Sequence, residues 1–238
     1  IMQDTKLPLF TWILGLYYVT TSKQGISSEC LAERLGISTK ASRLMMRKIR
    51  YAMEVSNETF TLADTIEMDG TYVGSPSKNG KRGLGTDKTP VLISLSLDKG
   101  LYPKYLQMNI MKTECRHEIK KYLNQNVDVA NTKKIVTDGK QSYLFIKKEY
   151  SQIKLESIVY NEKTYPGHLK WLHIITSNLK SFLQGTYHGV ESKYLRLNLA
   201  EFVWRFNHRK QGTDILECIT KVLLCCSVMT RKQLQNLF

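Results

Sequence analysis

The stretch DTIEMDGTYVG, residues 64–74, decides the fold of this chain. It mixes β-branched and aromatic residues around a central aspartate, Asp69, which is typical of a strand that ends near Tyr72. From about residue 61 the sequence therefore changes from a helical to a strand pattern. We expect the first strand of a sheet here, with Asp69 inside the strand or at its end.

Further strands and helices follow this stretch. Residues 90–98 and 101–110 are typical of two strands joined by a hairpin at Lys99 and Gly100. The remaining elements are expected, in chain order, as a helix over 112–125, a short buried strand over 133–139 that contains Asp138, a helix over 141–149, a strand over 153–160, and helices over 168–183, 193–207 and 213–224.

The order of these elements predicts both the fold and the domains. Three antiparallel strands followed by alternating helices and strands is the order of a ribonuclease-H-like nuclease or integrase core. We therefore expect an α/β fold with a mixed five-stranded sheet and flanking helices. The expected domains are a helix-turn-helix domain over 1–60, the core over 61–210 and a C-terminal helical extension over 211–238.

The first 60 residues have a helical pattern, in contrast to the strands that follow. A compact apolar segment over residues 7–18 precedes GISSECLAERLGISTKASRLMMRKIRYAM, residues 25–53. In this stretch Gly36 breaks one helix, and Ser38 or Thr39 caps a second one. This arrangement predicts a helix-turn-helix.

The second helix of this pair is basic along one face. Arg43, Arg47 and Arg50 fall at positions i, i+4 and i+7, Lys40 lies nearby, and no acid occurs from residue 38 to residue 51. The second helix of a helix-turn-helix enters a DNA groove, so these four residues are predicted DNA contacts. An ordinary helical hairpin with a solvated basic face has the same pattern, and this segment alone leaves both interpretations open.

The charge of the whole chain points to a polyanionic partner. Its 238 residues include 35 Lys and Arg against 21 Asp and Glu, a formal net charge of +14. Such an excess is typical of proteins that meet nucleic acid or an anionic membrane surface. The most apolar run, residues 7–19, is shorter than a membrane helix, and no lipidation or membrane-surface feature is present. We therefore expect no membrane partner.

The cysteines indicate a reducing compartment. The five cysteines are odd in number, scattered and without a CxxC pair. That pattern argues against a disulfide scaffold and against a zinc finger. We expect an intracellular protein, nuclear in a eukaryotic host and cytoplasmic in a bacterium.

Asp69 and Asp138 are the candidate metal ligands. Two carboxylates on adjacent central strands suit Mg²⁺, which takes oxygen ligands and keeps water molecules for its substrate. Phosphodiester chemistry commonly uses two such ions about 3.5–4 Å apart. An aspartate followed by glycine, as in Asp138 and Gly139, is also typical of an ordinary turn.

Six stretches occur together in a known order. They are GISSECLAERLGISTKASRLMMRKIRYAM, IEMDGTYVG, KRGLGTDKTPV, KKIVTDGKQSY, NLKSFLQGTYHGV and KYLRLNLAEFVWRFNHR. Through them the chain, from about residue 7 to 209, resembles transposases of the Merlin superfamily and the related bacterial insertion-sequence transposases. The resemblance implies a DDE-type core that cuts and joins DNA with Mg²⁺ or Mn²⁺. It also implies double-stranded DNA from the terminal repeats of a mobile element as partner, and it admits a homodimer.

The resemblance also implies roles for individual residues. Asp69 matches the first catalytic aspartate, Asp138 the second, and Lys180 the lysine that lies two turns after the third acidic position. That third position, seven residues before the lysine, holds His173 here, and no Asp or Glu occurs from residue 163 to residue 190. The family glutamate after the first aspartate is missing too, because Gly70 follows Asp69.

The histidine decides what we expect of catalysis. Imidazole suits Zn²⁺, Cu²⁺ or Fe²⁺ better than Mg²⁺. We therefore expect a transposase-like DNA-binding protein, ancestrally a strand-cleaving and strand-transfer enzyme, that is catalytically impaired. The rival hypothesis is an active site in which Asp69, Asp138 and His173 hold the metal, with a preference for Mn²⁺.

Other basic side chains are weaker candidates for phosphate contacts. A solvated loop or an ordinary helix end explains each of them equally well. They are Lys81, Arg82 and Lys88 in a glycine-rich loop, His188 in a turn, and Arg205 and Arg209 at a helix end.

Overall fold

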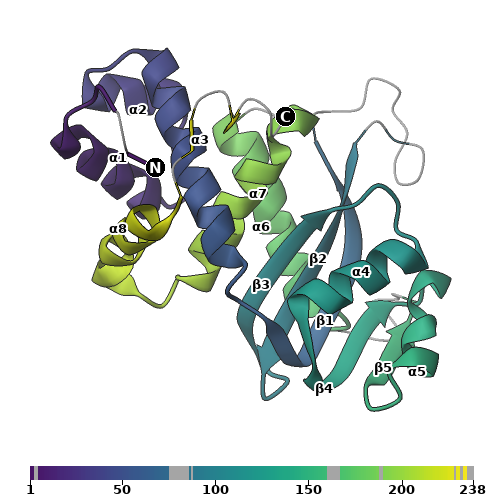
Figure 1. Cartoon of the computed structure of the whole chain (residues 1–238). Coiled ribbons are helices and arrows are strands. Elements are labelled where there is room, and N and C mark those ends of the chain that lie inside the picture. Colours follow the sequence, from purple (N-terminus) through teal and green to yellow (C-terminus); the bar gives the residue numbers. More distant parts are fainter. Residues whose placement is uncertain are drawn as a thin grey trace. The chain divides into compact units, whose positions relative to one another are not determined.

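The computed structural model describes residues 1–2, 5–74, 86, 88–159, 167–187, 190–227, 229–230 and 233–234 (Figure 1). The chain forms two compact units, one of Phe60–Ser181 and one of Ile1–Thr59 with Phe182–Phe238. This grouping differs from the predicted domains, because the helices that follow residue 182 pack with the N-terminal helices. No helix in the described part of the chain is long and apolar enough to cross a membrane.

The unit Phe60–Ser181 is built on a mixed five-stranded sheet in the order β3-β2-β1-β4-β5. Strand β1 pairs antiparallel with β2 and parallel with β4, β2 pairs antiparallel with β3, and β4 pairs parallel with β5. The strands are β1 (Leu62–Val73), β2 (Thr89–Asp98), β3 (Tyr102–Ile110), β4 (Val127–Asp138) and β5 (Lys154–Ile158). The predicted α/β class with a ribonuclease-H-like mixed sheet is thereby confirmed.

Helices cover the sheet and place its core. Helix α4 (Arg116–Asn126), the short 3-10 helix η1 (Gln141–Tyr143) and α5 (Phe145–Glu149) pack on one face (Figure 1). Helix α6 (Lys170–Tyr187) begins against β1, where the backbone N–H of Leu172 donates to Glu67 Oε2 at 2.9 Å. The hydrophobic core of this unit includes the buried side chains of Ile66, Met68, Ile119, Leu123, Ile135, Tyr143 and Ile146.

The turn between β2 and β3 agrees with the sequence-based prediction, whereas the start of helix α4 differs from it. Lys99 and Gly100 both have left-handed backbone angles, φ 49° and 71°, as a tight hairpin between β2 and β3 requires. Helix α4 begins at Arg116, four residues later than expected, because Cys115 is extended and acts as its N-cap residue. Residues 112–115 therefore form a loop in front of the helix.

The second unit is helical. Its helices are α1 (Leu9–Thr21), α2 (Ser28–Leu35), α3 (Thr39–Asn57), α7 (Ser192–Asn207) and α8 (Ile215–Cys225). The two helices expected around Gly36 are present: Gly36 ends α2 at φ 63°, and the Ser38 side chain caps α3 by accepting from Ala41 N. Apolar faces of α1, α3, α7 and α8 meet around Trp12, Met45 and Trp204.

Candidate active site

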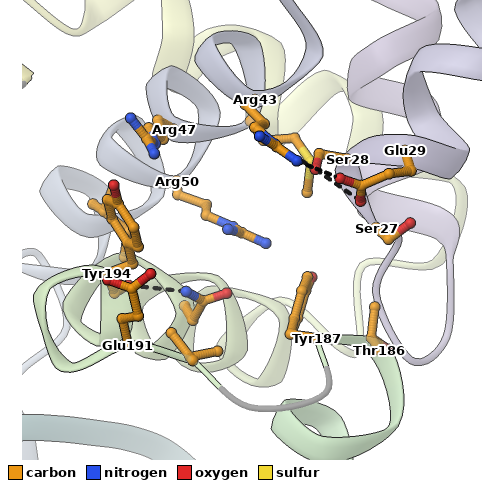
Figure 2. A pocket seen from close by; sticks show the side chains of 14 residues that line it. Ser27, Ser28, Glu29, Arg43, Arg47, Arg50, Thr186, Tyr187, Glu191 and Tyr194 are labelled. Carbon is orange, nitrogen blue, oxygen red and sulfur yellow. Dashed lines mark hydrogen bonds and ion pairs between the residues drawn. The ribbon is translucent and has the colours of Figure 1, made fainter. Parts of the chain in front are cut away.

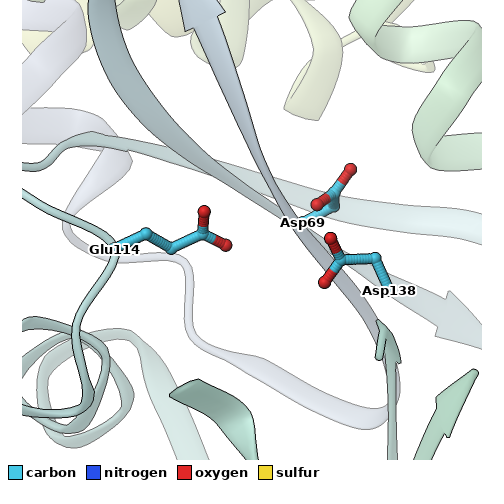
Figure 3. Close-up of side chains that lie close together, drawn as sticks. All are labelled: Asp69, Glu114 and Asp138. Carbon is cyan, nitrogen blue, oxygen red and sulfur yellow. The ribbon is translucent and has the colours of Figure 1, made fainter. Parts of the chain in front are cut away.

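The sheet brings Asp69 and Asp138 side by side. Met68 of β1 and Thr137 of β4 are partners in the parallel ladder, so the next residue on each strand is an aspartate. Met68 packs in the core beneath α4 and α5, and side chains alternate along a strand. Asp69 and Asp138 therefore point to the opposite face of the sheet. The predicted adjacency of these two carboxylates is confirmed (Figure 3).

A third carboxylate joins them, and it comes from a place that the sequence did not indicate. Glu114, in the loop between β3 and α4, offers a carboxylate oxygen within 4.8 Å of one from Asp69 and one from Asp138 (Figure 3). Sequence reasoning missed Glu114 because residues 112–125 were expected to form a helix. One signal in the sequence pointed to a carboxylate from elsewhere: Gly70 stands next to Asp69, where the family that this chain resembles has a glutamate.

Gly70 makes room for this glutamate. A Cβ atom at position 70 would lie 2.5 Å from Glu114 Oε2 and 2.7 Å from Oε1, too close for any real contact. The hydroxyl of Tyr143, a fully buried residue, donates to Glu114 Oε1 at 2.7 Å. Burial raises the pKa of Tyr143 well above its ordinary value, so the hydroxyl keeps the proton that it donates.

One ammonium group lies among the three carboxylates. Lys140 Nζ is 2.9 Å from Glu114 Oε2, 3.0 Å from Asp138 Oδ2 and 3.5 Å from Asp69 Oδ1. Gly139, at φ 68°, turns the chain between Asp138 and Lys140. Burial opposes the charge of Lys140, but its hydrogen bonds to Glu114 and Asp138 outweigh this and raise its pKa above the ordinary value. The group is therefore an ammonium at neutral pH.

The cluster has the chemistry of a divalent-metal site. Burial, together with the neighbouring charge of Asp138, raises the pKa of Asp69 to about 7. Asp138 Oδ1 is buried and has no hydrogen-bond partner among the described residues, and the buried Asp69 Oδ1 has only the Lys140 ammonium group at 3.5 Å. Buried carboxylate oxygens without a donor are suited to a cation, and Mg²⁺ and Mn²⁺ take oxygen ligands of this kind. The residues present therefore fit such an ion.

His173 lies outside this cluster. At the start of α6, His168 Nε2 is 3.0 Å from the carbonyl oxygen of Thr137, directly before Asp138. Half-burial of His173, with the neighbouring His168, lowers its pKa, so its imidazole is neutral at pH 7. Within the described ranges, His173 belongs to no group of three ligands that meets the 4.8 Å distance. Its metal role stays a prediction, as does the role of Lys180, which is exposed on α6.

The predicted DNA contacts of α3 differ in their surroundings. Lys40 and Arg43 are exposed, and Arg43 pairs with Glu29 at 2.6 Å. The guanidinium of Arg47 lies 4.4 Å from the ring centre of Tyr194. Arg50 is different: it is buried, and its Nε donates to Glu201 Oε2 at 2.7 Å, so it does not belong to an exposed basic face.

The remaining predicted contacts lie elsewhere in the chain. Arg205 pairs with Glu201 at 3.3 Å and also donates to the carbonyl oxygen of Ser22. Arg209 lies over the ring of Phe206 at 4.0 Å, and Lys88 is partly exposed before β2. Residues 81, 82 and 188, the predicted contacts Lys81, Arg82 and His188, fall outside the described residues.

Comparison with known proteins gives one family and several distant structures. The family model described as "ISXO2-like transposase domain" matches residues 61–207, more than half of the chain. Comparison with curated proteins gives no match.

Solved structures with similarity include the catalytic core domain of BIV integrase, at 14% identity over 58% of this chain and 80% of that chain, with a TM-score of 0.38. A simian T-cell lymphotropic virus intasome in complex with the PP2A regulatory subunit B56 gamma matches at 10% identity over 74% of this chain and 63% of that chain, with a TM-score of 0.38. The Mos1 strand transfer complex matches at 13% identity over 96% of this chain and 82% of that chain, with a TM-score of 0.30.

Proposed function

The chain belongs to the ISXO2-like transposase family, and from that premise we propose that it cleaves and joins DNA strands with a divalent metal held by Asp69, Asp138 and Glu114. The observation that carries this proposal is the carboxylate of Glu114 beside the two aspartates. Glu114 would provide a third acidic ligand from the β3–α4 loop, whereas the family pattern predicts that ligand on α6. The metal is Mg²⁺ or Mn²⁺, since both accept a set of three carboxylates.

Each residue of the site has a separate task. Asp69 and Asp138 would hold the ion from strands β1 and β4, and Glu114 would hold it from a loop, where its carboxylate accepts a hydrogen bond from the Tyr143 hydroxyl. When bound, a divalent ion supplies Lewis-acid stabilisation of the charge that develops on phosphate oxygens. Lys140 offsets part of the carboxylate charge in the metal-free chain, and its side chain would have to leave the cluster for a metal to bind there.

The substrate in this proposal is double-stranded DNA carrying the terminal repeats of a mobile element. The net charge of +14 and the exposed basic residues Lys40 and Arg43 on α3 support a polyanionic partner. A homodimer, which the resemblance admits, remains part of this proposal.

A second function is favoured by a different observation. The family's third acidic position on α6 holds His173, and Lys140 already offsets part of the carboxylate charge. A chain in which Glu114 does not ligate is either a DNA-binding protein that has lost cleavage or an enzyme that uses Asp69, Asp138 and His173.

Metal-dependent cleavage of DNA that carries the sequence flanking the gene separates these alternatives. The native chain is compared, in Mg²⁺ and in Mn²⁺, with Asp138→Ala, Glu114→Gln and His173→Gln. Glu118→Gln is the matched control, because it removes a carboxylate four residues away on α4. Mn²⁺ binding is measured in parallel by titration calorimetry, so that the ligand role is tested apart from activity.

The proposal expects cleavage and Mn²⁺ binding to be lost in Asp138→Ala and Glu114→Gln and retained in His173→Gln and Glu118→Gln. Loss in His173→Gln with retention in Glu114→Gln would establish the Asp-Asp-His site instead. A native chain that binds DNA without cleaving it, and that gains cleavage through His173→Glu, would establish the impaired protein.

A further inference from the structure

We infer that a basic cavity in the helical unit binds a phosphate group of a nucleotide, through the guanidinium groups of α3. The cavity has a volume of about 730 Å³ and lies among α2, α3, the end of α6 and α7 (Figure 2). Its lining includes three arginines and two tyrosines: Arg43, Arg47, Arg50, Tyr187 and Tyr194. The inference goes beyond strand cleavage, since it concerns no metal and no residue of the carboxylate cluster.

Arg50 provides the strongest observation. Its side chain is nine-tenths buried and extends into the cavity (Figure 2). Its Nε donates to Glu201 Oε2, on α7. Its Nη2 is buried and has no hydrogen-bond partner among the described residues. A buried donor without an acceptor costs about 1–3 kcal/mol. An anion in the cavity would supply the missing acceptor.

The charge around the cavity is positive despite the carboxylates present. The buried Glu201 is shared by two guanidinium groups, Arg50 at 2.7 Å and Arg205 at 3.3 Å, so one positive charge there is not balanced. Arg43 is paired with Glu29 at the rim, and Glu191, which also lines the cavity, is paired with Lys193 at 2.7 Å. Arg47 adds a further positive charge one turn from both Arg43 and Arg50. The surplus favours an anionic ligand.

The side chains that line the cavity favour a nucleotide phosphate among the possible anions. A guanidinium presents parallel N–H donors that match the oxygens of a phosphate. Tyr187 and Tyr194 line the same cavity, and aromatic rings are the surfaces on which bases and sugars stack. A cavity of this volume falls within the roughly 300–1,000 Å³ typical of small-molecule sites, enough for a nucleotide and not only for an inorganic ion. Two sources share this chemistry, a free nucleotide and a nucleotide of a DNA strand.

The test uses the full chain in EDTA, so that it is independent of metal binding. Titration calorimetry measures binding of inorganic phosphate, deoxyadenosine 5′-monophosphate, deoxyadenosine and a short DNA duplex. The variants are Arg50→Lys, which keeps the charge beside Glu201 but removes Nη2, and Arg47→Gln. Arg34→Gln is the matched control, because Arg34 is exposed on α2 and does not line the cavity. Circular dichroism confirms that each variant is folded.

A free-nucleotide site predicts binding of the monophosphate but not of deoxyadenosine, weakened at least tenfold in Arg50→Lys and Arg47→Gln and unchanged in Arg34→Gln. A DNA-strand site predicts the same pattern of variants for the duplex, with no binding of the monophosphate. The inference is overturned if the native chain binds neither, or if the cavity variants bind both as the native chain does. If Arg50→Lys does not fold, Arg47→Gln decides alone. Failure of strand cleavage leaves these titrations unaffected.

Discussion

Lys140 places its ammonium group within 3.5 Å of a carboxylate oxygen from Asp69, Glu114 and Asp138. Three carboxylates this close repel one another, and the ammonium offsets that repulsion where no metal is bound. A divalent ion held by the three carboxylates, as proposed here, would occupy the same position. At the scale of residues, the metal-free and metal-bound states therefore compete for one place in the site.

Replacing Lys140 with an uncharged residue is expected to raise the affinity of the site for a divalent metal. Lys140→Met should tighten Mn²⁺ binding about tenfold, or about 1.4 kcal/mol, a modest gain because the Lys140 side chain is 42% exposed and solvent screens its charge. Titration calorimetry of Mn²⁺ measures this change. Lys147→Met, which removes an exposed lysine of α5, is the control and should leave the affinity unchanged. Equal affinities of Lys140→Met and the native chain would contradict competition.

Gly70 is expected to be a steric requirement of the Glu114 position. Gly70→Ala places a methyl group 2.5 Å from the native Glu114 carboxylate, which must then move away. Because that carboxylate is the far end of a flexible side chain, we expect weaker Mn²⁺ binding with little loss of folding stability. The double variant Gly70→Ala with Glu114→Gln should bind Mn²⁺ no more weakly than Glu114→Gln. Additive losses would show that the two residues act separately.

The raised pKa of Asp69 predicts how stability depends on pH. Its pKa is about 7 in the folded chain against an ordinary value of 3.8, so the folded chain binds the extra proton between these values. Stability of the metal-free protein should therefore fall as pH rises from about 4 to about 7. The groups that face Asp69 are Glu114, Asp138, Lys140 and Tyr143.

Asp69→Asn removes this dependence and provides the measurement. The two pKa values differ by about 3 units, so at about 1.4 kcal/mol per unit the variant should be more stable than the native chain by on the order of 4 kcal/mol at pH 8 and by little at pH 4. Urea denaturation in EDTA at both pH values measures the difference. A constant difference between the two proteins across this range would contradict the assignment.

At the scale of elements, two glycines with left-handed backbone angles end β4 and α2. Gly139, at φ 68°, follows the last residue of β4, and a Cβ there would lie 2.9 Å from the backbone nitrogen of Val159. Gly36, at φ 63°, ends α2 in open space, with no atom within 4 Å of an added Cβ. The first turn thus needs glycine for its angle and for space, and the second for its angle alone.

These two glycines form a matched pair of variants. Gly36→Ala should cost about 1 kcal/mol of folding stability, the cost of a left-handed residue other than glycine. Gly139→Ala should cost more, because the backbone must also shift, and it should weaken Mn²⁺ binding by displacing Asp138 and Lys140. Urea denaturation and metal titration measure both effects. A Gly139→Ala variant that keeps native metal affinity would show that the turn does not position the site.

At the scale of the whole molecule, charge and family point to the same partner. The net charge of +14 is a property of the full sequence, and the chain belongs to a family of transposases. Binding of basic proteins to DNA releases counterions, so the affinity falls as salt rises. The proposed DNA interface can therefore be measured residue by residue through its salt dependence.

Lys40→Gln is expected to reduce the slope of log affinity against log salt by about 0.9, the value for one lost phosphate contact. Lys40 is exposed at the start of α3, so the change should leave the fold intact. Fluorescence anisotropy with a duplex at several salt concentrations measures the slope. Lys148→Gln, an exposed lysine of α5, is the control. An unchanged slope in Lys40→Gln would remove α3 from the interface.

The sequence by itself determined the α/β class, the strands β1 to β5, the adjacency of Asp69 and Asp138 and the transposase family. These follow from local patterns and from motifs that lie within single elements, such as the β-branched and aromatic residues of β1. Even the hairpin at Lys99 and Gly100 was apparent, because its turn is made of neighbouring residues.

Only the tertiary structure placed Glu114 and Lys140 in the cluster and buried Arg50 beside Glu201. Glu114 comes from a loop between elements, and Arg50 pairs with a carboxylate 151 residues away. A periodic pattern along the chain therefore predicts neither contact. The spacing of Arg43, Arg47 and Arg50 predicted one basic face, but packing of α3 against α7 buries the last of them. Contacts between distant segments depend on how elements pack, and packing is settled by the whole chain and not by any one stretch of it.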